Sequence, residues 1–252
     1  MGGPFMRVLV VFLSLFVGLF VGLAVADAKP RRKAKEHNLA VREDDQEKRP
    51  KIKGQSVGKP WEGSLRNASR LRLGDGAHIR RPHRTYGTRT TIEHTRNAIN
   101  DVLERFKNTH DLAIGDISAE HGGWISDHHS HQSGRDVDLG LFYKKQPPGY
   151  PVYLADANEK NLDCARTWAL VSNLTRTVDK DGGVQVIYLD YDVQGILYRW
   201  AKKQGVSDKR LERIFQYANG RGSSGSIVRH YRNHANHLHV RFRCSEKDKQ
   251  CY

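Results

Sequence analysis

The sequence contains few cysteines. Three cysteines in 252 residues exclude a fold that depends on many disulfides. Cys244 and Cys251 are near enough in the sequence to close a short loop in an oxidising compartment, and we expect a disulfide there, with two free thiols as the alternative. Cys164 is left over, and its apolar helical position beside Trp168 favours a buried small hydrophobic residue over a nucleophile.

Acidic residues are also scarce, with 28 Asp and Glu against 42 Lys and Arg, which gives a formal net charge of +14. This excess favours an anionic partner such as a cell-wall polymer, lipid headgroups or nucleic acid, without choosing among them. Large apolar residues are nearly absent from residues 29–55, where basic side chains outnumber acidic ones. Such a segment cannot form a core, so we expect a disordered basic linker there.

One long apolar run stands near the start of the sequence, at residues 8–25, and a single Arg7 precedes it. Small residues at 24, 26 and 28 offer cleavage sites, so residues 1–28 are expected to be a signal peptide. Because the run is long for a signal peptide, an uncleaved membrane anchor is the alternative. Either segment directs the rest of the chain out of the cytoplasm, to the periplasm or the medium.

Residues 56–252 are expected to form one folded domain, and they contain no regular alternation of strands and helices. Helices are predicted at about 92–107, 162–174 and 193–201 and after Ser207, and strands at about 112–117, 136–143, 184–189 and 237–242. Thr90 and Glu93 match a capping box for the first helix. The mixed order indicates an α+β fold, with a small mainly antiparallel sheet flanked by helices.

Two histidine-rich segments constrain function most tightly. They are HHSHQSGRDVDLG at 128–140 and HANHLHVRF at 234–242. In the second, His237 and His239 alternate with apolar residues, so a strand would turn both imidazoles to the face opposite Leu238 and Val240. In the first segment, Gly134 permits the turn that precedes a strand-like run. The two segments can therefore contribute ligands to one metal pocket.

A hydrolytic zinc ion takes three ligands from His, Asp and Glu and keeps a fourth position open. His131, Asp138 and His239 form such a set, and His237, on the same strand face as His239, is the candidate general base. His128 and His234 are expected to line the pocket, where they stabilise charge in the tetrahedral intermediate or orient the ligands. Asp136 is interpreted as a supporting carboxylate rather than a ligand.

The segments SHQSGRDVD (130–138) and HANHLHVRFRC (234–244) resemble the penicillin-insensitive murein endopeptidases, part of the wider lysostaphin, D-alanyl-D-alanine carboxypeptidase and hedgehog-like group of zinc folds. The resemblance implies the same zinc ligands, His131, Asp138 and His239, with His237 as catalytic histidine. It further implies hydrolysis of the D-alanyl to meso-diaminopimelyl amide in peptidoglycan cross-links. His129 and Asp136 replace the serine and small residue of the carboxypeptidases, which disfavours carboxypeptidase activity.

Two other functions remain open on the sequence alone. A secreted metal-dependent nuclease would suit the positive charge, but hard oxygen ligands or an Asn-paired histidine motif would then be expected, so we predict no nucleic-acid partner. A non-catalytic wall-binding protein could keep zinc for structure alone. Arg135, Arg232 and Arg241 lie near the motifs and are candidates for binding peptidoglycan carboxylates, although a solvated basic surface explains them nearly as well.

Overall fold

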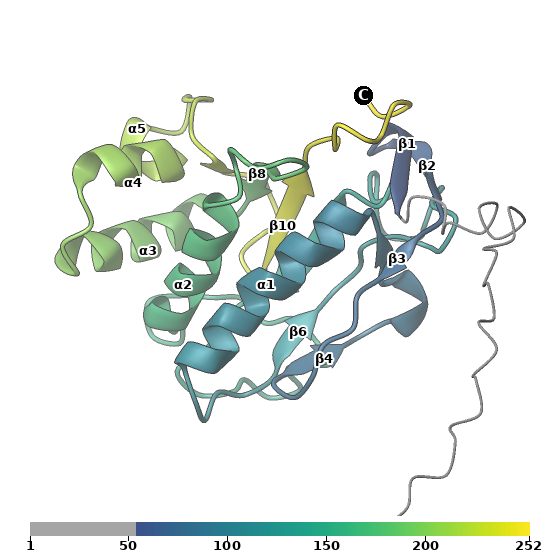
Figure 1. Cartoon of the computed structure of the whole chain (residues 1–252). Helices are drawn as coiled ribbons and strands as arrows, with labels where there is room; N and C mark the ends of the chain where they lie inside the picture. Colours follow the sequence, from purple (N-terminus) through teal and green to yellow (C-terminus); the bar gives the residue numbers. More distant parts are fainter. Residues whose placement is uncertain (1–53) are drawn as a thin grey trace, which may run out of the picture. The chain divides into compact units, whose positions relative to one another are not determined.

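The computed structural model describes residues 54–252 (Figure 1). The predicted signal peptide or anchor (1–28) lies outside these residues, as does the predicted linker (29–55) up to residue 53. The described strands are β1 (Gln55–Lys59), β2 (Glu62–Arg66), β3 (Ser69–Arg70), β4 (Ala77–Ile79), β5 (Tyr86–Gly87), β6 (Leu112–Ile114), β7 (Asp136–Gly140), β8 (Val184–Tyr188), β9 (Val228–Arg229) and β10 (His237–Phe242). The described helices are the short 3-10 helix η2 (Pro82–Arg84), α1 (Arg89–Arg105), α2 (Cys164–Thr175), α3 (Tyr191–Lys203), α4 (Asp208–Ile214) and α5 (Gln216–Asn219).

Six of these strands form one sheet in the order β4-β6-β7-β10-β8-β9. Its central pairs, β6-β7, β7-β10 and β10-β8, are antiparallel, and its two outermost pairs are parallel. Two further small sheets are formed by β1 with β2 and by β3 with β5. The mixture of helices with a mainly antiparallel sheet agrees with the α+β prediction.

The alternation of β10 sets the two faces of the sheet. Leu238, Val240 and Phe242 are fully buried, and each such side chain contributes about 1.5–3 kcal/mol to folding. His94 of α1 stacks on Phe242, with ring centroids 6.2 Å apart, and α1 and α2 cross the sheet on this side (Figure 1). A shift of one residue would turn His239 into this core, so the apolar residues fix the register of the strand.

The first helix begins before its predicted start, because Thr88 and not Thr90 is its N-cap. Thr88 has an extended backbone, and its Oγ1 accepts a hydrogen bond from the Thr91 N–H at 3.1 Å. The capping box predicted for Thr90 and Glu93 is therefore wrong. Thr90 already lies inside the helix, and Glu93 pairs with Arg89 at 3.2 Å. The later helices lie where the periodicity predicts them, whereas β6 and β7 are shorter than predicted.

The segment before α1, for which no secondary structure is predicted from the sequence, forms β1 to β5. Strands of two to five residues are too short to show a clear alternation of polar and apolar side chains. The β1-β2 hairpin supports the loop that carries the first histidine segment, since the Gln132 N–H donates to the Pro60 carbonyl at 2.9 Å.

The last residues of the chain pack on the same hairpin, where the Gly58 N–H donates to the Gln250 carbonyl at 2.8 Å. The expected disulfide joins Cys244 to Cys251. Cys164 is half-buried rather than fully buried, and burial raises the pKa of its thiol, which disfavours the nucleophilic thiolate. Among residues 54–252, no helix is long and apolar enough to cross a bilayer.

Candidate metal centre

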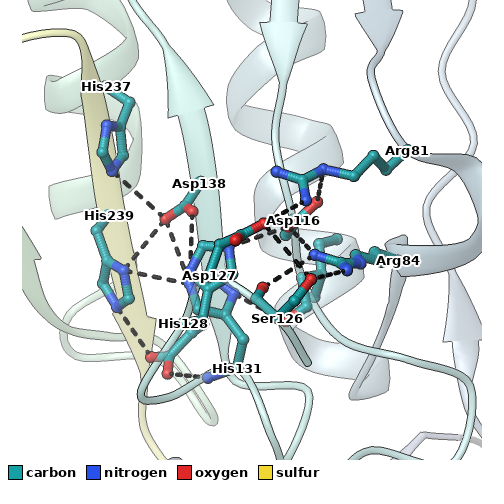
Figure 2. Close-up of polar contacts among 12 residues, drawn as sticks. Arg81, Arg84, Asp116, Ser126, Asp127, His128, His131, Asp138, His237 and His239 are labelled. Carbon is teal, nitrogen blue, oxygen red and sulfur yellow. Dashed lines mark hydrogen bonds and ion pairs between the residues drawn. The ribbon is translucent and has the colours of Figure 1, made fainter. Parts of the chain in front are cut away.

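The pairing of β7 with β10 brings the two histidine-rich segments together. His239 lies directly opposite Asp138, and His237 lies opposite Gly140. Opposite residues of an antiparallel pair are neighbours on one face of the sheet, and Asp138 Oδ1 is accordingly 3.1 Å from His239 Nδ1. Figure 2 shows Asp138 between the two β10 histidines on one side and the histidines of the loop before β7 on the other.

His131 reaches this point through a tight turn before β7. His131 and Gly134 have φ angles of 68° and 69°, in the left-handed region that favours glycine. A Cβ at Gly134 would lie 2.9 Å from the Gly87 Cα, so this position needs glycine for space as well. The turn places His131 Nε2 3.4 Å from Asp138 Oδ1 and 3.3 Å from His239 Nδ1.

The three predicted ligands fit a zinc ion. His131 Nε2, Asp138 Oδ1 and His239 Nδ1 are 3.1–3.4 Å from one another. Ligand atoms in a tetrahedron around zinc are separated by about 3.3–3.4 Å. Asp138 Oδ1 is buried and has no hydrogen-bond partner among the described residues. Two imidazoles and one carboxylate are also the donor set of many hydrolytic zinc centres.

Groups behind each imidazole turn its lone pair toward this point. His131 Nδ1 donates to the Ile117 carbonyl at 2.9 Å, so its Nε2 carries no proton in the neutral ring. His239 Nε2 faces Asp136 Oδ1 at 3.4 Å, which favours a proton on Nε2 and leaves Nδ1 free. Arg241 Nε in turn holds the same Asp136 oxygen at 2.7 Å. Asp136 therefore stands behind His239 and not at the converging point.

The convergence of these groups attracts positive charge. Burial opposes ionisation of Asp138, but the neighbouring imidazoles of His131 and His239 hold its pKa well below the ordinary range. Burial also opposes protonation of His239, yet the carboxylates of Asp136 and Asp138 raise its pKa to about 9. Both shifts arise because lone pairs and carboxylates converge on one buried point, which favours positive charge there. A proton or a metal ion can supply that charge.

His237 lies beside the converging point as a free base. Its Nδ1 donates to Asn236 Oδ1 at 2.6 Å, and its Nε2 is 3.8 Å from Asp138 Oδ1. Burial lowers the pKa of His237 to about 4, although the charge of Asp138 acts in the opposite direction. The ring is therefore neutral at pH 7, with its Nε2 lone pair directed toward Asp138.

The other two predicted histidines lie around the same point. His128 Nδ1 is 3.8 Å from Asp138 Oδ2, and the ligating atoms of His128, His131 and Asp138 all lie within 4.8 Å of one another. This trio is a second group able to hold a metal ion, and it shares two members with the predicted set. His234 lies farther out, with its ring centroid 4.6 Å from that of His237. The structure thus brings all six predicted site residues together.

A buried ion cluster that contacts His128 was not predicted from the sequence. Asp116 accepts hydrogen bonds from His128 Nε2 at 3.0 Å and from Arg84 Nη1 at 2.9 Å, and Arg81 Nε lies 3.1 Å from its other oxygen (Figure 2). Burial opposes ionisation of Asp116, but these partners lower its pKa. The sequence feature that could have revealed this cluster is an acidic residue, Asp116, inside the apolar run 112–117. Since β6 ends at Ile114, Asp116 lies beyond the strand.

A pocket of about 660 Å³ opens over these side chains, and its wall includes the exposed aromatic rings of Trp61 and Tyr231. Arg80 and Arg232 also line it, and neither forms an ion pair with any residue in the described part of the chain. Arg80 Nε donates to the Val152 carbonyl at 2.8 Å. The pocket therefore combines a candidate metal centre with two guanidinium groups that have no acidic partner among the described residues.

Two of the three arginines predicted to bind carboxylates are not free to do so. Arg135 is buried and donates to the backbone carbonyl of Tyr252 at 3.0 Å. Arg241 lines the pocket, but its guanidinium already donates two hydrogen bonds to Asp136. Both arginines stabilise the fold around the site, and Arg232 alone of the three is exposed at the pocket without an acidic partner among the described residues.

Comparison with known proteins identifies the family. Residues 56–252 match the family described as penicillin-insensitive murein endopeptidase. Over 148 residues, 56% of this chain, the sequence is 30% identical to a penicillin-insensitive murein endopeptidase of Yersinia enterocolitica, and 29% identical to proteins of the same name from Yersinia pestis and Yersinia pseudotuberculosis. The match covers 48% of each of these relatives, so the chain spans about half the length of the curated relatives that it matches. Because the family match includes both histidine-rich segments and the C-terminal disulfide, the chain belongs to the penicillin-insensitive murein endopeptidase family.

Proposed function

We propose that this protein is a zinc-dependent murein endopeptidase that hydrolyses the D-alanyl to meso-diaminopimelyl amide of peptidoglycan cross-links. The observation that carries the proposal is the convergence of His131 Nε2, Asp138 Oδ1 and His239 Nδ1 within 3.1–3.4 Å of one another, beside a neutral His237. The family membership supports the substrate class. The hedgehog-like fold that the sequence resemblance implies is part of the same proposal.

His131, Asp138 and His239 would hold the zinc ion. When bound, zinc polarises the scissile carbonyl and acidifies water, so that a hydroxide nucleophile is available near neutral pH. The carboxylate of Asp138 and the two neutral imidazoles leave net positive charge at the site. Asp136 and the Ile117 carbonyl keep the ligand rings in place through the nitrogen atoms that face away from the pocket.

His237 accepts the proton of the attacking water through Nε2. Its pKa of about 4 keeps it unprotonated at pH 7, and Asn236 fixes the proton of the ring on Nδ1. The same histidine can then pass the proton to the departing amine. His128 and His234 belong to the catalytic group that we propose, because both line the pocket that contains the proposed ligands.

Arg80 and Arg232 support an anionic substrate. Stem peptides of peptidoglycan carry free carboxylates, which guanidinium groups bind through paired hydrogen bonds. Both arginines reach the pocket without an acidic partner among residues 54–252. This charge arrangement, together with the predicted export segment, suits an enzyme that acts in the periplasm on cross-linked peptides.

Digestion of purified sacculi tests this function. We expect the wild-type protein to release muropeptides, and mass analysis should show cross-linked dimers converted to monomers by hydrolysis of the D-alanyl to diaminopimelyl bond. A zinc chelator should abolish the reaction, and added zinc should restore it. Conversion of dimers joined through two diaminopimelyl residues instead would contradict the proposed bond specificity but not the enzyme class.

The same assay separates the two rival functions. A non-catalytic wall-binding protein would sediment with sacculi and release no muropeptide in the presence of zinc. A nuclease would degrade plasmid DNA under the same conditions and leave sacculi intact. We expect sacculus hydrolysis without DNA cleavage.

A further inference from the structure

Asp116 is held rigidly next to the candidate metal centre. Its side chain is completely buried, and its backbone carbonyl accepts a hydrogen bond from the Asp138 N–H at 3.0 Å. The carboxylate is therefore fixed relative to β7, the strand that carries a proposed zinc ligand. Three groups surround it: Arg84 at 2.9 Å, Arg81 at 3.1 Å and His128 at 3.0 Å.

The chemistry of these groups determines which nitrogen of His128 carries the proton. Arginine side chains only donate hydrogen bonds, and an ionised carboxylate only accepts them. Since two guanidinium groups pair with Asp116, its carboxylate is ionised and must accept from His128 Nε2. In a neutral imidazole the proton then resides on Nε2, and Nδ1 presents a lone pair.

That lone pair faces the reacting centre. His128 Nδ1 lies 3.8 Å from Asp138 Oδ2, and His237 Nε2 lies 3.8 Å from Asp138 Oδ1 (Figure 2). Two hydrogen-bond acceptors therefore flank one proposed ligand. A water molecule has two protons, and one acceptor for each proton fixes its orientation, with a lone pair left for attack on the carbonyl.

We infer that Asp116 is a positioning residue that holds His128 in the tautomer whose Nδ1 accepts a hydrogen bond from the attacking water. This role rests on the proposed hydrolysis, in which two histidines contact the attacking water. His237 removes one proton of the water, and His128 holds the second proton without removing it. Arg81 and Arg84 keep Asp116 in its accepting form.

The substitution Asp116→Asn tests this role, with Asp127→Asn as the matched control. An Asn side chain at 116 can keep its oxygen toward Arg81 and then turns its amide N–H toward His128 and Arg84, whose guanidinium keeps its hydrogen bonds to Ser126. His128 Nε2 must accept that N–H, so its own proton moves to Nδ1 and blocks the acceptor. Asp127 pairs with the same Arg81 at 3.2 Å but is exposed, and its carboxylate forms no hydrogen bond or ion pair with the ring of His128, the next residue in the described chain. Its variant changes the same net charge without touching the tautomer.

Two measurements decide the outcome. Nitrogen-15 NMR of the zinc-containing wild-type protein at pH 8 should find His128 protonated on Nε2 and not on Nδ1. In Asp116→Asn the proton should move to Nδ1, and kcat on cross-linked muropeptide dimers should fall about 10–100-fold, as for other groups that orient a site from outside, with KM little changed. Asp127→Asn should retain both the wild-type tautomer and kcat.

A proton on Nδ1 of wild-type His128 would overturn the inference, whether or not the Asp116 variant folds. Equal kcat values for folded Asp116→Asn and Asp127→Asn would also overturn it. If wild-type protein releases no muropeptide, the proposed function fails, and the NMR result still reports separately whether Asp116 sets the tautomer of His128.

Discussion

Metal binding should strengthen steeply as the pH rises from 7 to 9. In the metal-free protein the carboxylates of Asp136 and Asp138 raise the pKa of His239 to about 9. A metal ion that binds His239 Nδ1 must displace this proton, because a ligand histidine has to be neutral. At pH 7 about 1% of the molecules have lost the proton, and at pH 9 about half have lost it.

The expected change in apparent metal affinity is therefore about 50-fold, or about 2 kcal/mol. Competition with a chromogenic zinc chelator at a series of pH values measures this change directly. Calorimetry in buffers of different ionisation enthalpy should also find about one proton released per zinc ion at pH 7. An affinity that is the same at pH 7 and pH 9, with no proton release, would refute the assignment of His239 as a ligand with a raised pKa.

The stability of the metal-free protein should change in the opposite direction. The folded-state pKa of His239 lies above the reference value of about 6.5, so its protonation stabilises the fold fully below that reference value. This contribution is lost as the pH rises through 9, and the unfolding free energy should fall by about 2 kcal/mol between pH 7 and 9. Asp136 and Asp138, whose pKa values are lowered, stay ionised throughout this range and add no slope.

Asp136→Asn tests whether the Asp136 carboxylate raises the pKa of His239. It removes a carboxylate that raises the pKa of His239, so the dependence of metal affinity on pH should begin to level at a lower pH than in the wild type. Asp127→Asn removes an exposed carboxylate that does not contact His239, and its curve should match that of the wild type. Superimposable curves for all three proteins would show that Asp136 does not set this pKa.

Three further predictions concern catalysis and stability. His237→Ala should keep zinc and lose about 10²–10⁴-fold in kcat, whereas His131→Ala should lose zinc as well; metal analysis beside muropeptide release checks both. Leu238→Ala should lower the unfolding free energy by about 2–5 kcal/mol in denaturant titrations, because Leu238 is fully buried, and a loss below 1 kcal/mol would contradict its place in the core. Replacing Cys244 and Cys251 together by Ser opens a loop with a sequence separation of 7 and should cost about 2.5 kcal/mol, measured by thermal unfolding beside the wild type in reductant.

The sequence predicted the local features of the site because those depend on short-range patterns. The alternation around His237 and His239 identified β10 and its two faces, since side chains of a strand point to opposite faces in turn. The turn at Gly134 and the disulfide between Cys244 and Cys251 also follow from local spacing. The wrongly placed helix cap at Thr90 marks the limit of such reasoning, because Thr88 offers the same side chain and an extended backbone two residues earlier.

By itself the sequence determined which residue types are available for a zinc centre, and the order of α1 to α4 with β6, β7, β8 and β10. The tertiary structure decided which of these residues meet. The register of β10 against β7 places His239 opposite Asp138, and no short-range pattern specifies a pairing of strands about a hundred residues apart in the chain. The tertiary structure also shows that Asp136 pairs with Arg241, that Asp116 contacts His128, and that Arg80 lines the pocket. These contacts join segments distant in the sequence, and they exist because the folded core brings those segments to one face of the sheet.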